Sequence, residues 1–358
     1  MKILHITKEI YPTNKTGLGV SSYFHKKILK EKGNNYKLVT SKSFFGNSYD
    51  KSFYRLLPRS RMYNLRAKKI IKNFNPDLVI VESLQTFISE IFIYSAQNLR
   101  IKTCLFSHGV SIFPYSMKLS YFLRFIIWIP YMFFMYLILR KLDYFFTFST
   151  KFENFRNIDL LFVKYFSKSK IIKYFNTSRF EKYRNYKFKQ NDNKILLNIG
   201  YVDHIKCQME FVNLANQLKN LNIKFVICYT NYNYNYLSKV KKFIKKKNIK
   251  NVIFIKGTKK NIISSLKKCN YLISTSITEV FPVTIIEALS LGKSSISFNL
   301  GNINANKFIF KCSNLNEMKN KIIHLIKKKN ETKKIRDYYK KNFSFLTLKK
   351  IIQKNIQI

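Results

Sequence analysis

Acidic residues are scarce in this sequence: 18 Asp and Glu stand against 66 Lys and Arg, so the formal net charge is +48. Such an excess is typical of proteins that bind nucleic acid or an anionic membrane surface. An AT-rich genome predicts the same lysine excess, because the chain is also loaded with Asn, Ile, Tyr and Phe. Both interpretations of the charge stay open at this point.

Cysteine is also rare, with five residues. No two of them have a metal-ligand spacing such as C-x2-C, and an odd number does not suit a disulfide framework. We therefore expect a reduced, cytosolic setting and no bound metal. The start of the chain, MKILHI, leaves no room for a signal peptide before polar residues arrive, so we expect a first strand there.

Short apolar runs alternate with helical patterns along 358 residues, a length that suits two domains. Continuous apolar runs suit parallel strands that are buried on both faces. The expected strands are 2–7, 36–40, 77–82, 101–106 and 143–149, and then 194–199, 224–229, 251–255, 270–275 and 294–298. The expected helices include 60–73, 207–219, 236–247, 261–268, 283–291 and 315–328.

This alternation in two blocks predicts an α/β protein with two doubly wound, Rossmann-like parallel sheets facing an interdomain cleft. The polar segment 181–193 places the boundary, which gives domains at 1–180 and 181–345. Residues 346–358 form a further helix that crosses back to the first domain, with Thr347 as its N-cap. Ligands of such sheets bind beyond the carboxyl ends of the strands, so the loops there are the candidate sites.

The most informative segment is 274–293, where an apolar strand is followed by a short loop and a helix. Glu279 lies in the loop and Glu287 in the helix, Pro282 suits the first helical turn, and Gly292 suits the C-terminal cap. Carboxylates here can accept hydrogen bonds from a ribose diol or from sugar hydroxyls. Open N–H groups at the helix start can hold a diphosphate, namely those of Val283, Thr284 and Ile285.

This segment resembles the paired-glutamate signature of the glycosyltransferase group 1 family, a retaining family of GT-B architecture, and the resemblance extends over nearly the whole chain. It implies that Glu287 binds the nucleotide ribose and that Glu279 contacts the donor sugar. The family loop reads Glu-Gly-Phe-Gly, whereas this one reads Glu279-Val280-Phe281-Pro282. Phe281 keeps its place as a donor-binding residue, but Pro282 has no N–H to donate.

Three further segments fit this family. Gly200 and Lys206 match its Gly-Arg-x-x-x-x-Lys pattern after a strand, with Tyr201 in place of the arginine, and the lysine can neutralise a leaving diphosphate. His108, in Phe-Ser-His-Gly after strand 101–106, resembles the His-Gly loop near the donor sugar. Gly19 resembles the N-terminal glycine loop that approaches the diphosphate. Catalytic roles are thus implied for His108 and Glu279.

An apolar run at 121–139 is long enough to span a membrane. A single crossing would separate strands 101–106 and 143–149, which belong to one sheet, so we expect a helix at the membrane interface or, alternatively, in the core. In the interfacial interpretation the membrane contacts are Arg124, Trp128 and Phe133.

These observations predict a retaining, metal-independent glycosyltransferase that needs no cofactor besides its nucleotide-sugar donor. The expected acceptor is a lipid-linked sugar or glycan, as in surface polysaccharide or lipopolysaccharide synthesis. We expect a peripheral position on the cytoplasmic face of an anionic membrane and no nucleic-acid partner. Two alternatives remain: a noncatalytic relative that binds sugar nucleotides, and a basic protein that binds nucleic acid.

Overall fold

The computed structural model describes residues 1–14, 16–31, 33–46, 60–110, 119–151, 157–183, 194–299, 301–328 and 331–357, with side chains from 128 onward in the segment that begins at 119. The chain forms two compact units. The first comprises residues 1–175 and 348–358, and the second comprises residues 176–347. The predicted linker residues 184–193 lie outside the described part.

The first unit is built on a six-stranded parallel sheet with the strand order β2-β1-β3-β4-β5-β6. Its strands are β1 (Lys2–Thr7), β2 (Asn35–Thr40), β3 (Leu78–Glu82), β4 (Lys102–Phe106), β5 (Tyr144–Thr147) and β6 (Lys170–Lys173). Its helices are α1 (Gly17–Leu29), α2 (Ser41–Phe45), α4 (Ser60–Phe74), α5 (Ile88–Asn98), α6 (Leu119–Leu139) and α7 (Ile158–Phe166).

The second unit repeats this plan, with the strand order β12-β11-β10-β7-β8-β9. Its strands are β7 (Lys194–Val202), β8 (Ile223–Tyr232), β9 (Val252–Lys256), β10 (Tyr271–Ser274), β11 (Ser294–Phe298) and β12 (Ile309–Cys312). Its helices are η4 (Glu181–Tyr183), α8 (Gln208–Gln217), α9 (Tyr234–Lys246), α10 (Lys259–Lys268), α11 (Val283–Ser290), α12 (Leu315–Leu325) and α13 (Thr332–Phe343). The predicted pair of doubly wound parallel sheets is confirmed.

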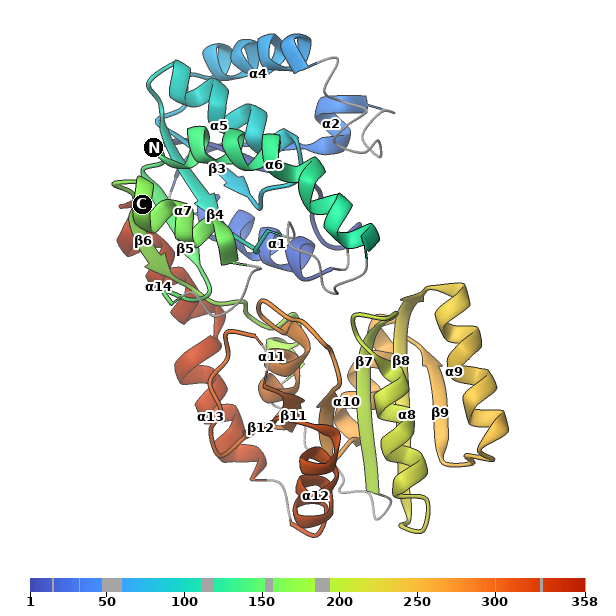
Figure 1. Cartoon of the computed structure of the whole chain (residues 1–358). Coiled ribbons are helices and arrows are strands. Elements are labelled where there is room, and N and C mark those ends of the chain that lie inside the picture. The colour runs from blue at the N-terminus through green and yellow to red at the C-terminus, as the bar shows by residue number, and fades with distance from the viewer. Residues whose placement is uncertain are drawn as a thin grey trace. The chain divides into compact units, whose positions relative to one another are not determined.

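The last helix, α14 (Phe345–Ile356), starts in the second unit and ends in the first. Its start corrects the predicted cap: the N–H of Thr347 donates to the hydroxyl of Ser344 at 3.3 Å, so Ser344 caps the first turn and Thr347 lies inside the helix. An ion pair between Lys349 and Glu31 ties the helix to the segment after α1. Ile356 and Gln357 share a surface pocket with Met1, so both ends of the chain lie on the first unit (Figure 1).

The central strands are apolar because helices cover both faces of each sheet. All five residues of β3 are buried, and its last residue is a glutamate, Glu82. An acidic side chain buried at the carboxyl end of a central strand lies where ligands of doubly wound sheets bind. This position marks the first unit's candidate site.

Candidate active site

The start of α11 is the predicted diphosphate site, and it is built as an open helix N-terminus. Pro282 is the N-cap residue, and no described side chain caps this end. The N–H groups of Val283 and Thr284 therefore have no partner within the helix. The expectation for Ile285 is wrong, because its N–H donates to the carbonyl oxygen of Pro282 at 3.1 Å.

Glu287, predicted to bind ribose, is fully buried one turn further along α11. Its Oε1 accepts a hydrogen bond from Nε of Arg179 at 2.6 Å. Its Oε2 has no hydrogen-bond partner among the described residues. A buried, unsatisfied carboxylate oxygen costs free energy unless a ligand completes it. The site therefore offers one acceptor oxygen, held in place through the other.

Glu279 and Lys206, predicted for the donor sugar and the diphosphate, form an ion pair with each other. The Ser276 hydroxyl donates to the same carboxylate at 2.8 Å. Lys206 is about one-third exposed, at 30%, so its ammonium group is accessible to solvent. A diphosphate that binds Lys206 has to compete with Glu279 for the ammonium group.

Gly200 does not follow the strand as predicted but lies inside β7, beside an irregularity in the pairing with β8 between Gly200 and Val202. A Cβ at Gly200 would lie 3.6–3.7 Å from the side-chain carbons of Lys206, an ordinary van der Waals contact, so the lysine stem lies beside this position but does not require a glycine there. The carbonyl of Lys206 accepts from the Thr275 hydroxyl at 3.0 Å. Tyr201, in the place of the family arginine, is 38% exposed.

Phe281 is buried and lies edge-on to Phe343, the last residue of α13, at 6.4 Å between ring centroids. The loop before it is held by Gly301, which has φ +76°. A Cβ there would lie 3.0 Å from Pro282 and 3.3 Å from Glu279. The structure thus gives Phe281 a packing role that fixes the loop between the two glutamates.

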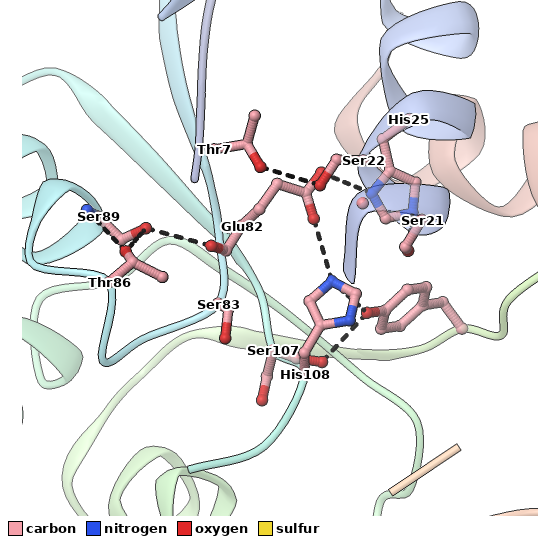
Figure 2. A network of polar contacts seen from close by, with 12 residues as sticks. Thr7, Ser21, Ser22, His25, Glu82, Ser83, Thr86, Ser89, Ser107 and His108 are labelled. Carbon is pink, nitrogen blue, oxygen red and sulfur yellow. Dashed lines mark hydrogen bonds and ion pairs between the residues drawn. The ribbon is translucent and has the colours of Figure 1, made fainter. Parts of the chain in front are cut away.

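In the first unit, His108 lies beside Glu82, a residue that the sequence interpretation did not single out. Nε2 of His108 is 3.1 Å from Oε2 of Glu82, and Figure 2 shows Glu82 between His108 and His25. Oε1 of Glu82 is 2.7 Å from Nδ1 of His25 and 2.9 Å from Nε2 of His5. Both of these histidines are fully buried, and the His108 side chain is 10% exposed.

The electrostatics of this cluster favour an ionised glutamate and a neutral His108. Burial raises the pKa of Glu82, but the three imidazoles outweigh it and hold that pKa well below its usual range. Burial lowers the pKa of His108, against the opposing influence of the Glu82 carboxylate. At neutral pH the cluster is a carboxylate surrounded by imidazole N–H donors.

A second buried carboxylate, Asp159 of α7, supports the loop that carries His108. The Ser107 hydroxyl donates to Asp159 and accepts from the N–H of Gly109 at 3.1 Å. Burial raises the pKa of Asp159 to about 6, although the bond from Ser107 acts to lower it. The residues on both sides of His108 are thus connected to α7: Ser107 bonds Asp159 directly, and Gly109 bonds Ser107.

Gly19, predicted to approach the diphosphate, lies in the first turn of α1 and is buried. Its N–H donates to the Thr16 hydroxyl at 3.4 Å, and its carbonyl accepts from Tyr11 at 3.0 Å. A Cβ at this position would lie 2.3 Å from the carbonyl oxygen of Asn14. The structure therefore explains the glycine by close packing of the turn at residues 11–14.

The apolar run forms α6, and its described half divides into two faces. Tyr131, Met135, Ile138 and Leu139 are buried in the core of the first unit. Trp128 is half-buried and lies edge-on to Tyr131 at 5.0 Å, whereas Phe133 is 65% exposed. The side chain of Arg124 is outside the described part. The described half of the run, from residue 128 onward, is therefore core along one face and solvent-exposed along the other.

Two kinds of feature are absent from the described residues. No helix there combines the length and the apolarity of a membrane span. No group of three or more His, Cys, Asp or Glu side chains there is arranged to hold a metal ion, the Glu82 cluster included.

Residues 179–342 match the family model "Glycosyl transferases group 1", so the predicted family is confirmed for the second unit. No curated protein sequence matches the chain. The fold is similar to that of sucrose-phosphate synthase from Thermosynechococcus elongatus, with a TM-score of 0.71, 12% identity, and coverage of 100% of this chain and 98% of that one.

Two further solved structures share the fold. The lipopolysaccharide outer core galactosyltransferase WaaB has a TM-score of 0.68 and 15% identity, with 99% of this chain and 98% of that chain covered. Anabaena HepE, solved in complex with UDP, has a TM-score of 0.65 and 13% identity, with both chains covered completely. At these identities the three likenesses show the fold alone, and the predicted GT-B architecture is confirmed.

Proposed function

From the premise that residues 179–342 match the glycosyl transferases group 1 family, we propose that this protein transfers a glycosyl group from a nucleoside diphosphate sugar with retention of anomeric configuration. The bond between the anomeric carbon and the phosphate oxygen breaks, and a bond from that carbon to an acceptor hydroxyl oxygen forms. The nucleoside diphosphate leaves, and the hydroxyl proton is released. No redox partner is needed.

The observation that carries the proposal is the Glu287 carboxylate. One oxygen is held by Arg179, and the other is buried without a described partner on the helix whose N-terminus is open. We assign the ribose hydroxyls to that second oxygen and the diphosphate to the N–H groups of Val283 and Thr284, with Lys206 as a counter-charge. Preorganised N–H groups and an ammonium group stabilise charge that develops on a leaving diphosphate.

The sugar end is assigned to Glu279 and His108. Glu279 exchanges its ion pair with Lys206 for sugar hydroxyls when the diphosphate draws the lysine away. His108 accepts a hydrogen bond from a hydroxyl of the substrate. Because helix N–H groups and lysine balance the leaving charge, turnover is expected to persist in EDTA.

The acceptor is proposed to be a lipid-linked sugar or glycan at the cytoplasmic face of a membrane. An aromatic ridge, formed by Phe133 and Tyr136 of α6 with Tyr165 and Phe166 of α7, supports this. Tyr136 lies 6.5 Å from Phe133 and 5.2 Å from Phe166 between ring centroids, and Phe133, Tyr165 and Phe166 are 55–76% exposed. Exposed basic residues adjoin the ridge in sequence: Arg140, Lys141, Lys164 and Lys168. Aromatic rings flanked by cations suit the headgroup region of an anionic membrane.

The test is a panel of UDP-, GDP- and ADP-sugars, with release of nucleoside diphosphate as the readout and the anomeric configuration of the product read by NMR. We expect release with at least one donor, and slower release from Glu279→Gln than from the wild type. The exposed Glu331 offers a matched control as Glu331→Gln. Binding of a nucleotide without any release would identify a noncatalytic relative, and an inverted product would contradict retention.

A further inference from the structure

Three of the five histidines of the chain converge on one carboxylate. His5 comes from β1, His25 from α1 and His108 from the loop after β4, and all three lie within 3.1 Å of Glu82. Two of these histidines are fully buried, and their remaining ring nitrogens face polar groups. Nδ1 of His5 is 2.8 Å from the Tyr36 hydroxyl, and Nε2 of His25 is 3.5 Å from that of Ser21.

His108 differs from the other two because only its Nε2 has a hydrogen-bond partner among the described residues. An ionised carboxylate has only acceptor sites, so the hydrogen between His108 and Glu82 belongs to Nε2. A neutral imidazole carries one hydrogen, which leaves Nδ1 as an acceptor. The side chain of His108 is 10% exposed, whereas those of His5 and His25 are fully buried.

We propose that Glu82 is a positioning residue that holds His108 in its Nε2–H tautomer, so that Nδ1 of His108 accepts a hydrogen bond from a substrate hydroxyl. The inference deepens the proposed function and rests on it for the identity of that hydroxyl, which belongs to the donor sugar or the acceptor. It assigns His108 the role of an acceptor and not that of a general acid.

The charged and titratable groups around His108 fit this assignment. Glu82 faces it from β3 and His25 from α1, while Asp159 acts on it from α7. The Tyr174 hydroxyl, 3.5 Å from Nε2, donates to the carbonyl of Ser107 at 3.1 Å, so it does not supply Nε2 with a hydrogen. The three imidazoles compensate the buried charge of Glu82, and Glu82 in turn orients His108, the one of the three that is not fully buried.

The first test needs no substrate. Long-range ¹H–¹⁵N correlation spectra of histidine-labelled protein at pH 7.5 distinguish the two tautomers, and the His108→Asn spectrum assigns the signal. We expect His108 as the Nε2–H tautomer in the wild type. A His108 signal of the Nδ1–H tautomer, or of an imidazolium, overturns the proposal.

Variants then test whether Glu82 is what fixes the His108 tautomer. In Glu82→Gln the amide can donate as well as accept, so the fixed tautomer is expected to give way to a mixture, and loss of the negative charge should shift the titration of His108 to lower pH. His5→Gln is the matched control, because its amide nitrogen can replace the Nε2–H donor of His5 and leave the His108 tautomer unchanged. An unaltered His108 tautomer and titration in folded Glu82→Gln would overturn the role of Glu82. If Glu82→Gln does not fold, the wild-type tautomer still decides the inference.

Turnover gives a separate readout. Losing one positioned hydrogen bond is expected to lower kcat of Glu82→Gln about tenfold, with the affinity for nucleoside diphosphate unchanged because that ligand is assigned to the second unit. Equal kcat values would contradict the positioning role. If the wild type turns over no donor at all, the proposed function fails, whereas the tautomer measurement stands by itself.

Discussion

Among single residues, Lys206 is assigned two interactions that compete for its ammonium group. It neutralises Glu279 in the protein without ligand, and under the proposed function it neutralises the second phosphate of the leaving group. Because its stem lies against Gly200 in a strand and its carbonyl is held by Thr275, the head can change partner while the backbone stays in place. A lysine on a fixed backbone with a movable ammonium group suits a step in which negative charge develops.

Replacing Lys206 with alanine should weaken binding of nucleoside diphosphates about tenfold or more and leave monophosphates within about twofold, since a hydrogen bond to a charged group contributes about 1.5–3 kcal/mol. Titration calorimetry with both nucleotides measures the two affinities. Lys242, an exposed residue of α9, offers the control variant Lys242→Ala. Equal weakening of monophosphate and diphosphate binding would show that Lys206 does not contact the second phosphate.

Asp159 predicts a pH dependence of stability in the first unit. Its pKa is raised by burial to about 6, above the value of about 4 in an unfolded chain, so the folded state binds more protons between these values. Its favourable contribution is present below pH 4 and is lost as the pH rises through 6. Relative to Asp159→Asn, the wild type should therefore lose about 2–3 kcal/mol of unfolding free energy between pH 4 and pH 7.

The chain's single tryptophan makes the unfolding free energy of the first unit measurable. Trp128 packs on the core of the first unit, so its fluorescence during urea unfolding reports on that unit. Glu82 has a lowered pKa, so its contribution to stability changes with pH in the opposite direction and at acid pH. Because both proteins contain Glu82, this contribution cancels when Asp159→Asn is compared with the wild type. If the difference in unfolding free energy between the wild type and Asp159→Asn does not change with pH, the raised pKa of a buried Asp159 is contradicted.

The sequence pattern indicated candidate site residues in the second unit more directly than in the first. Glu279 and Glu287 lie eight residues apart on one loop and helix, so their spacing carried the information. Arg179 was missed because it meets Glu287 only through the fold, 108 residues away in sequence. The Glu82 cluster draws on four separate elements for the same reason, although a glutamate at the end of a predicted buried strand was a signal that the sequence did contain.

At the scale of elements, the interior strands were predictable because they are continuous apolar runs. The two strands that were missed, β6 and β12, are four residues long and lie at the edges of their sheets. The sequence KIIK of β6 is half-exposed, as suits an edge, and carries too short a pattern to stand out. The extension of β7 past Gly200 was likewise hidden, because a glycine in sequence marks a strand end and a bulge equally well.

The turn after α11 packs against the start of α13, and substitutions at its glycine can test that contact. Gly292 has φ +75°, and a Cβ there would lie 2.4 Å from Cγ2 of Thr332 and 2.9 Å from its carbonyl oxygen, where α13 begins. Gly33 has a similar φ of +70° and no described atom within 4 Å of a Cβ. Gly33→Ala should cost about 1–2 kcal/mol from backbone strain alone, and Gly292→Ala about 1–3 kcal/mol more from the clash.

Thermal unfolding followed by circular dichroism compares these two glycine variants with the wild type. We expect the lower midpoint for Gly292→Ala. Equal midpoints would show that α13 moves aside at little cost and does not hold the end of α11.

At the scale of the whole molecule, the charge of +48 and the aromatic ridge predict two separable forces at a membrane. Attraction of Lys and Arg to anionic lipid is screened by salt over about 8–10 Å, whereas burial of the aromatic rings is not. Flotation with anionic vesicles should show strong binding at low salt and weaker, persistent binding at 1 M salt. Phe133→Ser combined with Phe166→Ser should remove the salt-resistant part, since both side chains are more than half exposed.

The matched control for flotation is Tyr234→Ser, which removes an aromatic ring that is 77% exposed on α9 of the second unit. Salt-resistant binding that survives in the ridge variant would contradict the ridge as the membrane contact. Trp128 is left unchanged in this design, because its packing on the core makes its loss a test of folding instead.

Calorimetric titration of UDP, GDP and ADP measures whether the second unit holds a nucleoside diphosphate through Oε2 of Glu287, which has no hydrogen-bond partner among the described residues. The wild type should bind at least one of them without added metal. Glu287→Ala should bind that nucleotide at least about tenfold more weakly, since a hydrogen bond to a charged acceptor contributes about 1.5–3 kcal/mol, while Glu331→Ala retains the wild-type affinity. Unchanged affinity in a folded Glu287→Ala protein would remove Glu287 from the site and contradict the account.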